Sequence, residues 1–214
     1  MCFSPLASFS TAALAAVVGG VALTRITHWR QAPLAAMPLV LGAQQAIEGG
    51  LWLTLPVAPH GALTAALTLG YLVIGGALWP VYAPLAAGLV EPHPPRRGLI
   101  ALCLALGVGV GAYMLWAILT GPRDVAIVGR CIAYGVGERH SVPVALAYLA
   151  ATALPLILSS RRAIRLLGVI ALVGFAVAVA FYVRAFLSVW CFFAAAASVV
   201  ILAHFTASRG RAEC

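Results

Sequence analysis

Long apolar runs separated by short polar segments make up most of the chain. Runs of roughly 18 to 25 apolar residues are long enough to cross the roughly 30 Å hydrocarbon core of a bilayer as helices. The pattern predicts five such helices before the last quarter of the sequence, at about Leu6–Thr24, Pro33–Leu55, Leu63–Val90, Gly98–Leu119 and Val142–Leu158.

The last apolar stretch, Leu166–Thr206, is too long for a single crossing. As one helix rising 1.5 Å per residue it would be about 60 Å long, about twice the hydrocarbon core. Arg184 is its only arginine or acidic residue, and a tight turn there would divide the stretch into two spans. The sequence therefore predicts an all-α, integral membrane bundle of seven transmembrane helices, formed by residues 1–214 as a single domain.

Composition supports a membrane protein. Hydrophobic residues make up 64% of the chain and charged residues 8%, with a mean hydropathy of +1.07. Soluble domains carry about 25% charged residues, so a water-soluble globule, a disordered chain and a disulfide-rich secreted scaffold are excluded. All 13 basic residues are arginine. Without lysine the chain cannot form the Schiff base that holds retinal.

The distribution of arginines predicts the orientation, because cytoplasmic loops carry an excess of basic residues. Nine arginines fall on one side of the predicted spans: Arg25, Arg30, Arg96, Arg97, Arg161, Arg162, Arg165, Arg209 and Arg211. Four fall on the other: Arg123, Arg130, Arg139 and Arg184. We expect a multi-pass protein of the bacterial inner membrane with its N-terminus out and its C-terminus in. The net charge of +8 reflects these loops, and no nucleic-acid partner is expected.

Two features of the connections and helices are informative. Residues 121–141 form an external segment long enough to fold over the mouth of the bundle, with alternation too irregular to predict a strand. Gly107 and Gly111 make a small-xxx-small step, which is typical of close helix packing or of a dimer contact. The inverted repeat of many transporters is not evident in the sequence.

The second predicted helix carries the main polar cluster. At 100° per residue, Gln44, Gln45, Glu48 and Trp52 lie on one face, which must point into the bundle. Glu48 is the only carboxylate within the predicted spans, about 12 Å below the outer end of its helix. Three states are open: a neutral polar clamp, an ion pair with Arg184 or Arg130, or a site that binds a cation, a proton or a substrate.

The cysteines leave several alternatives open. Three of the five, Cys2, Cys131 and Cys191, lie toward the outer side, and the others are Cys103 and Cys214. The outer thiols are consistent with a disulfide such as Cys2–Cys131, with buried inert thiols, or with a soft-metal site. In the metal site, Cys2 and Cys191 would bind together with Glu48 or His140.

The opening of the last helix, SVWCFFAA, places Ser188, Trp190 and Cys191 at the depth of Glu48 if the chain turns at Arg184. Tyr134 and the tryptophans also suit the aromatic belt at a membrane interface. His28 and His204 stand at cytoplasmic helix ends, where a haem is not expected, and His60 and His93 are predicted to be solvated. Ser188, His140 and Glu48 share a side, but nothing orients them as a catalytic triad.

Three segments together resemble a family of small bacterial integral membrane proteins that has no assigned biochemical function. They are the start MCFS, the motif QQxxEGxxW in the second predicted helix, and SVWCFFAA near the end. The resemblance covers nearly the whole chain. It implies that the outer-side cluster is the family's common feature, and it implies no substrate.

These observations predict an outward-facing polar pocket that binds a small ligand or a metal ion, with residues 121–141 as its lid. The expected ligand-binding residues are Gln44, Gln45, Glu48, Trp52, Tyr134, Arg184, Ser188 and Trp190. Cys2, Glu48 and Cys191 are the expected metal ligands if the cofactor is a transition metal. One alternative is a structural or assembly subunit of a larger membrane complex. The other is a membrane enzyme of thiol or acid–base type. The expected partners are the lipid bilayer and either a larger membrane complex or further copies of this chain in a homo-oligomer.

Overall fold

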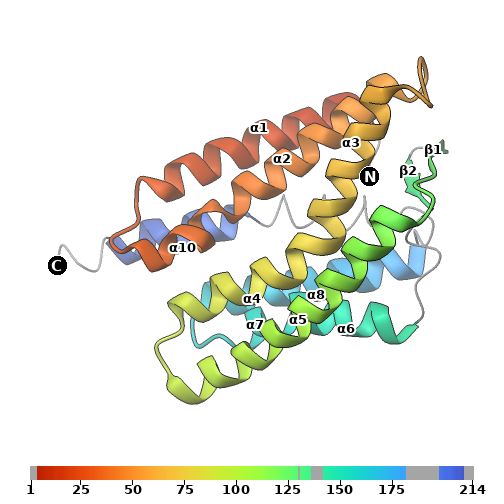
Figure 1. Ribbon diagram of the computed structural model, residues 1–214. Helices are drawn as coiled ribbons and strands as arrows, with labels where there is room; N and C mark the ends of the chain where they lie inside the picture. The colour runs from red at the N-terminus through yellow and green to blue at the C-terminus, as the bar shows by residue number, and fades with distance from the viewer. Residues whose placement is uncertain (1–3, 130, 136–141, 182–197, 210–214) are drawn as a thin grey trace.

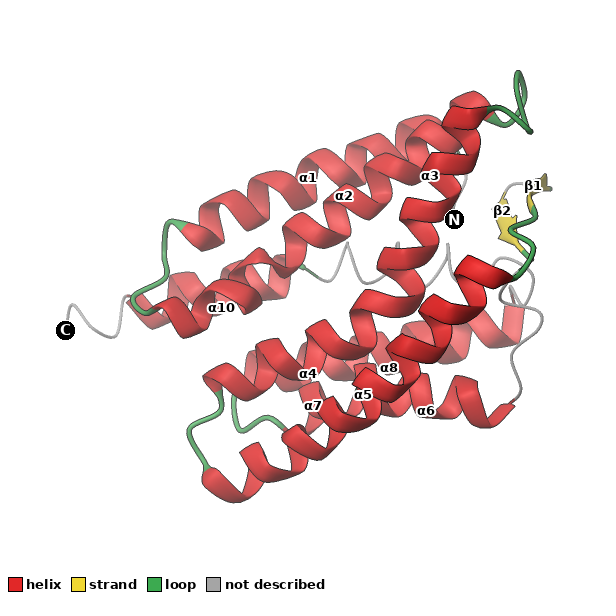
Figure 2. Ribbon diagram, viewed as in Figure 1, coloured by secondary structure: helices red, strands yellow, loops and turns green. Residues whose placement is uncertain are grey.

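The computed structural model describes residues 4–129, 131–135, 142–181 and 198–209. The described chain is mostly helical (Figures 1 and 2), as the apolar runs predict. Three of its helical segments are long and apolar enough to cross a membrane: Pro5–Leu23, Ala62–Val90 and Pro94–Thr120. The predicted turn near Arg184 lies outside the described residues.

The first two helices, α1 (Pro5–Leu23) and α2 (Ala32–Thr54), form an antiparallel hairpin joined by the short 3-10 helix η1 (Trp29–Gln31). α1 begins at Pro5 because the Ser4 hydroxyl accepts the Ala7 N–H at 3.2 Å. Small residues bring the two helices close together. A Cβ atom on Gly42 would lie 3.0 Å from the Ala12 carbonyl oxygen.

The third segment is one long helix with an irregular centre. α3 (Ala62–Leu72) and α4 (Trp79–Val90) are joined by a π-helical turn, η2 (Val73–Leu78). Pro80 has no N–H, so the carbonyl of Gly75, five residues before it, lacks the donor that π geometry would use. The buried Tyr148 hydroxyl donates a hydrogen bond to that carbonyl.

The fifth predicted helix is divided in the structure. α6 (Val142–Thr152) and α7 (Leu154–Leu158) follow one another with a break at Ala153. Pro155 explains the break, because its ring cannot continue the hydrogen-bond ladder of a helix. The other helices of the described residues are α5 (Pro94–Thr120), α8 (Arg162–Phe181) and α10 (Val199–Arg209).

Close packing at the small-xxx-small step is confirmed within the bundle. A Cβ atom on Gly107 of α5 would lie 1.8 Å from the carbonyl oxygen of Pro80 in α4. One on Gly111 would lie 2.7 Å from the carbonyl oxygen of Ala77 in η2. The two glycines therefore let the backbone of α5 approach the backbone of the preceding segment.

The segment after α5 forms a β-hairpin, although its alternation is too irregular to predict a strand. β1 (Val125–Val128) pairs antiparallel with β2 (Cys131–Tyr134), and Gly129 adopts the left-handed conformation, with φ of 63°, that the turn requires. The hairpin packs on the bundle because Ile132 and Tyr134 are buried among apolar side chains of α2, α3 and α5.

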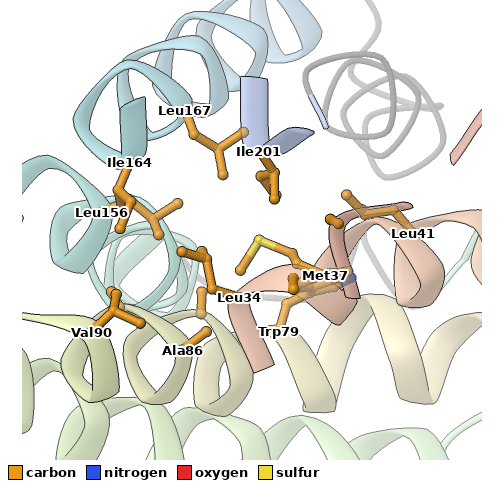
Figure 3. Close-up of a cluster of buried hydrophobic side chains, with 14 of the residues drawn as sticks. Leu34, Met37, Leu41, Trp79, Ala86, Val90, Leu156, Ile164, Leu167 and Ile201 are labelled. Atoms are coloured by element: carbon orange, nitrogen blue, oxygen red, sulfur yellow. The ribbon is translucent and has the colours of Figure 1, made fainter. Parts of the chain in front are cut away.

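The main core lies where α2, α4, α7, α8 and α10 meet (Figure 3). The side chains of this core that Figure 3 labels are Leu34, Met37, Leu41, Trp79, Ala86, Val90, Leu156, Ile164, Leu167 and Ile201. It draws on segments far apart in the sequence, so it fixes how the first hairpin sits against the later helices.

The connections separate into two ends (Figures 1 and 2). The α1–α2, α4–α5 and α7–α8 connections and the end of α10 lie at one end, and the β-hairpin and the α2–α3 connection lie at the other. The connections at the first end carry Arg25, Arg96 and Arg161 among their residues, and Arg123 lies in the connection to the hairpin at the other end.

Candidate functional site: a buried glutamine–glutamate cluster

The polar face of α2 is buried. Gln44, Gln45 and Glu48 have exposed fractions of 0%, 1% and 1%. Close contact with α1 holds this part of α2 in place, because a Cβ atom on Gly49 would lie 2.8 Å from the ring of Phe9. A buried amide or carboxyl group requires hydrogen-bond partners, so the surroundings of this cluster determine its chemistry.

The side chains of the cluster are hydrogen-bonded within and between helices. Trp79, the first residue of α4, donates its indole N–H to Oε1 of Gln44 at 2.9 Å. Gln45 donates its amide N–H to Oε2 of Glu48 at 3.3 Å. The π-helical turn η2 ends at Leu78, directly before Trp79. The hydrogen bond from Trp79 to Gln44 therefore joins the irregular centre of the third segment to the polar face of α2.

The apolar cluster beneath the hairpin borders this polar face. Trp52, one turn beyond Glu48, packs against it, and its indole N–H is buried without a hydrogen-bond partner among the described residues. In the same cluster Tyr134 stacks on Tyr71, with ring centroids 4.4 Å apart and planes 3° apart. The structure thus brings Tyr134 and Trp52 to one end of α2.

Other expected site residues lie outside the described ranges. They are Cys2, Arg130, His140, Arg184, Ser188, Trp190 and Cys191. In the described ranges, no group of three His, Cys, Asp or Glu residues is placed to hold a metal ion. Cys103 and Cys131 are buried free thiols.

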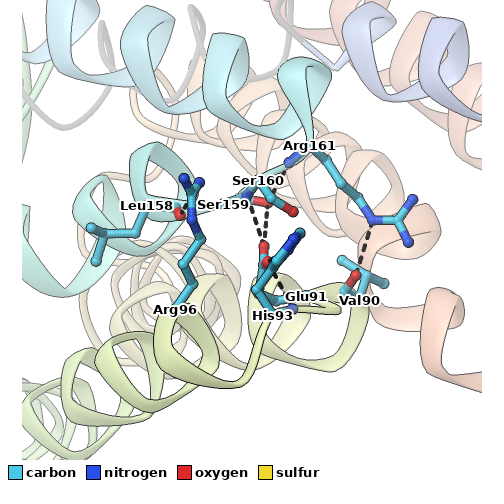
Figure 4. A network of polar contacts seen from close by, with 8 residues as sticks. All are labelled: Val90, Glu91, His93, Arg96, Leu158, Ser159, Ser160 and Arg161. Carbon is cyan, nitrogen blue, oxygen red and sulfur yellow. Dashed lines mark hydrogen bonds and ion pairs between the residues drawn. The ribbon is translucent and has the colours of Figure 1, made fainter.

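A second buried carboxylate, Glu91, escaped the sequence analysis (Figure 4). It lies in the α4–α5 connection with an exposed fraction of 2%. Its Oε2 accepts hydrogen bonds from the Ser159 hydroxyl at 3.1 Å and the Ser160 N–H at 2.8 Å. Its Oε1 accepts the His93 N–H at 3.2 Å and lies 3.1 Å from Nδ1 of the same residue.

Two arginines complete the contact between the α4–α5 and α7–α8 connections. Arg161 donates from Nε to the Val90 carbonyl at 2.9 Å, and Arg96 donates from Nη1 to the Leu158 carbonyl at 3.3 Å (Figure 4). His93, predicted to be solvated, has a side chain that is 63% exposed and is also paired with Glu91. Two sequence features could have indicated this contact. Glu91 directly follows one apolar run, and the segment SSRR at residues 159–162 directly follows another.

The surroundings of Glu91 keep it ionised. Burial raises the pKa of the carboxyl group, but hydrogen bonds from Ser160 and His93 outweigh it and lower the pKa from 4.5 to about 2. Both carboxylate oxygens of Glu91 accept hydrogen bonds from residues of the α4–α5 and α7–α8 connections. We therefore interpret Glu91 as a group that joins these two connections, and not as the centre of a ligand site.

The whole chain, residues 1–214, matches the model of a family of unknown function, DUF6629. The protein belongs to the DUF6629 family. This agrees with the resemblance of its motifs to a family without an assigned activity. Neither the curated proteins nor the solved structures contained a match.

Replacing Trp79 by phenylalanine should destabilise this DUF6629 protein by about 1–2 kcal/mol, because a buried hydrogen bond to Gln44 is lost while the ring is retained. Thermal unfolding in mild detergent measures the change. Trp116 of α5 is 62% exposed, so Trp116→Phe serves as the control and should leave the unfolding midpoint nearly unchanged. Equal effects of the two substitutions would contradict this role of Trp79.

Proposed function

We propose that this DUF6629 protein is a seven-span bacterial inner-membrane protein that binds a small ligand from the outer side, with Glu48 as the ionisable centre of the site. Three described segments with the length and apolarity of spans support the membrane location. The excess of arginine in the connections at one end supports a cytoplasmic position for that end. The hairpin end would then face outward.

The observation that carries the proposal is the burial of Glu48 beside Gln44 and Gln45 inside an apolar bundle. Placing an ionisable side chain within the membrane costs a few kcal/mol of insertion free energy. Such a side chain is therefore a candidate functional group by default. A carboxylate with neighbouring amide oxygens suits a positively charged group, either an organic ammonium or a metal ion. In an organic ligand, an acceptor atom beside the ammonium group would accept the Trp52 indole N–H.

The remaining expected site residues complete the proposed pocket. Tyr134, Arg184, Ser188 and Trp190 would line it, and Cys2 and Cys191 would supply thiolate ligands if the bound species is a metal ion. The β-hairpin would cover its outer side. The family motifs that carry Cys2, Glu48 and Trp190 would then serve one site.

Glu48→Gln should abolish binding while leaving the fold intact, because the amide keeps the shape of the side chain and removes its charge. Protein purified in mild detergent without a polyhistidine tag would be analysed for metals by elemental analysis and for organic ligands by native mass spectrometry. We expect one bound species per chain in the wild type and none in Glu48→Gln.

Asp124→Asn is the matched control, because Asp124 is an exposed carboxylate at the start of the hairpin. It should retain the bound species. Equal occupancy in the wild type and in Glu48→Gln would contradict the proposal. Stoichiometric purification with a larger membrane complex, together with an empty site, would favour the assembly-subunit function instead.

A further inference from the structure

A groove separate from the Glu48 cluster lies at the hairpin end of the molecule. It has a volume of about 410 Å³ and lies between the first half of α3 and the chain entering β1. Its lining includes His60, Thr64, Leu69, Arg123 and Val125. Small-molecule sites have volumes of about 300–1,000 Å³, so the groove is large enough for a ligand or a lipid headgroup.

Arg123 is the charged side chain that lines the groove, and the imidazole of His60 lies in the same lining. The N-terminus of α3, which begins at Ala62, adds the partial positive charge of a helix start. Asp124 is not part of the lining. Its carboxylate lies toward Gly135, where a Cβ atom would be 3.7 Å from Oδ2. Within the described chain, Arg123 forms no ion pair.

The walls of the groove are mainly apolar. Ala65, Ala66, Leu69 and Val125 form much of the surface. The polar groups on the same wall are turned to the backbone: the Thr64 hydroxyl donates to the Ala58 carbonyl at 2.7 Å. An occupant must therefore combine a negative group for Arg123 with apolar surface for α3 and β1.

We propose that this groove binds an anionic phospholipid, with the phosphate group on Arg123 and His60 and the start of the acyl chains against α3. A guanidinium group binds phosphate oxygens in a bidentate fashion, which favours a phosphate headgroup over an uncharged one. The apolar wall favours a lipid over inorganic phosphate. The position at the end of an apolar span is where a headgroup lies relative to its chains.

Binding of a short-chain lipid to the purified full-length protein tests the proposal. Dihexanoyl phosphatidylglycerol is the probe, and native mass spectrometry and the shift in thermal unfolding midpoint are the measurements. We expect saturable binding that weakens roughly tenfold in Arg123→Gln, the loss of one charged hydrogen-bonded contact. Arg123→Lys, which keeps the charge, should retain a larger part of the affinity than Arg123→Gln does.

Three comparisons make the result decisive. Arg97→Gln, an exposed arginine at the opposite end, should bind the lipid as the wild type does. Dihexanoyl phosphatidylcholine, which has no net charge, should bind more weakly, and inorganic phosphate should not compete at the same concentration. Equal binding of the two lipids, unchanged affinity in Arg123→Gln, or full competition by inorganic phosphate would each overturn the proposal.

Discussion

Replacing Gly107 by alanine is expected to destabilise the bundle by about 3 kcal/mol or more. The added methyl group would lie 1.8 Å from the carbonyl oxygen of Pro80 and 2.7 Å from its carbon. Overpacking usually costs about 1–3 kcal/mol, because side chains can shift aside. Here the obstacle is the backbone of α4, so relief requires the two helices to separate along their contact.

Gly109→Ala is the matched control for this prediction. Gly109 lies two residues further along the same helix, and a Cβ atom there would have no neighbour within 4 Å. Since alanine is the better helix former by about 1 kcal/mol, this substitution should be neutral or slightly stabilising. Apparent unfolding free energies in mild detergent measure both changes. A similar value for the two variants would show that α5 does not pack on α4 through Gly107.

Replacing Glu91 by glutamine is expected to cost about 2–4 kcal/mol. The amide oxygen can replace one carboxylate oxygen toward Ser160, but the amide nitrogen would then face the His93 N–H, and two donors cannot pair. Removing one member of a buried, charged hydrogen-bond network leaves its partners unsatisfied. The loss should also loosen the contact between the α4–α5 and α7–α8 connections.

The same carboxylate predicts a pH dependence of stability. The pKa of Glu91 is lowered to about 2 in the folded protein from an ordinary value of 4.5, so the folded state favours the charged form. Its contribution is therefore complete above pH 4.5 and is lost as the pH falls from there toward 2. The difference in stability between the wild type and Glu91→Gln should shrink over that range.

The unfolding free energies of the wild type and of Glu91→Gln would be measured at pH 6, 4 and 3 in the same detergent. The other carboxylates are present in both proteins, so the difference between the two free energies reports on Glu91. A stability difference that stays constant across this range would contradict the prediction. Hydrogen exchange of the Ser160 amide gives a second measurement, since this N–H is bonded directly to the carboxylate. It should exchange faster in the variant.

Local sequence features predicted much of the helical framework. The apolar runs placed α1, α2 and α5 to within a few residues, because the length of an apolar run and the polar groups that end it are properties of the chain itself. The spacing of Gly107 and Gly111 predicted a close helix contact for the same reason. Helical periodicity alone placed Gln44, Gln45 and Glu48 on a common face.

Features that depend on distant partners were not predictable. The π-helical turn η2 is accommodated by Tyr148, which lies 73 residues after Gly75 in the sequence. The β-hairpin is ordered by burial of Ile132 and by the stacking of Tyr134 on Tyr71. No local pattern identifies such partners, because hydrogen bonds and packing between segments arise only when the chain folds.

The helical, apolar character of the protein, its uneven arginine distribution and the polar face that carries Glu48 can be read from the chain alone. These properties follow from composition and periodicity, which need no partner. The hydrogen bond from Trp79 to Gln44, and the contacts by which Glu91 joins two distant connections, depend on how the helices pack. A buried polar group is stabilised by whichever donors the fold brings within about 3 Å, and in this protein those donors come from other helices and loops.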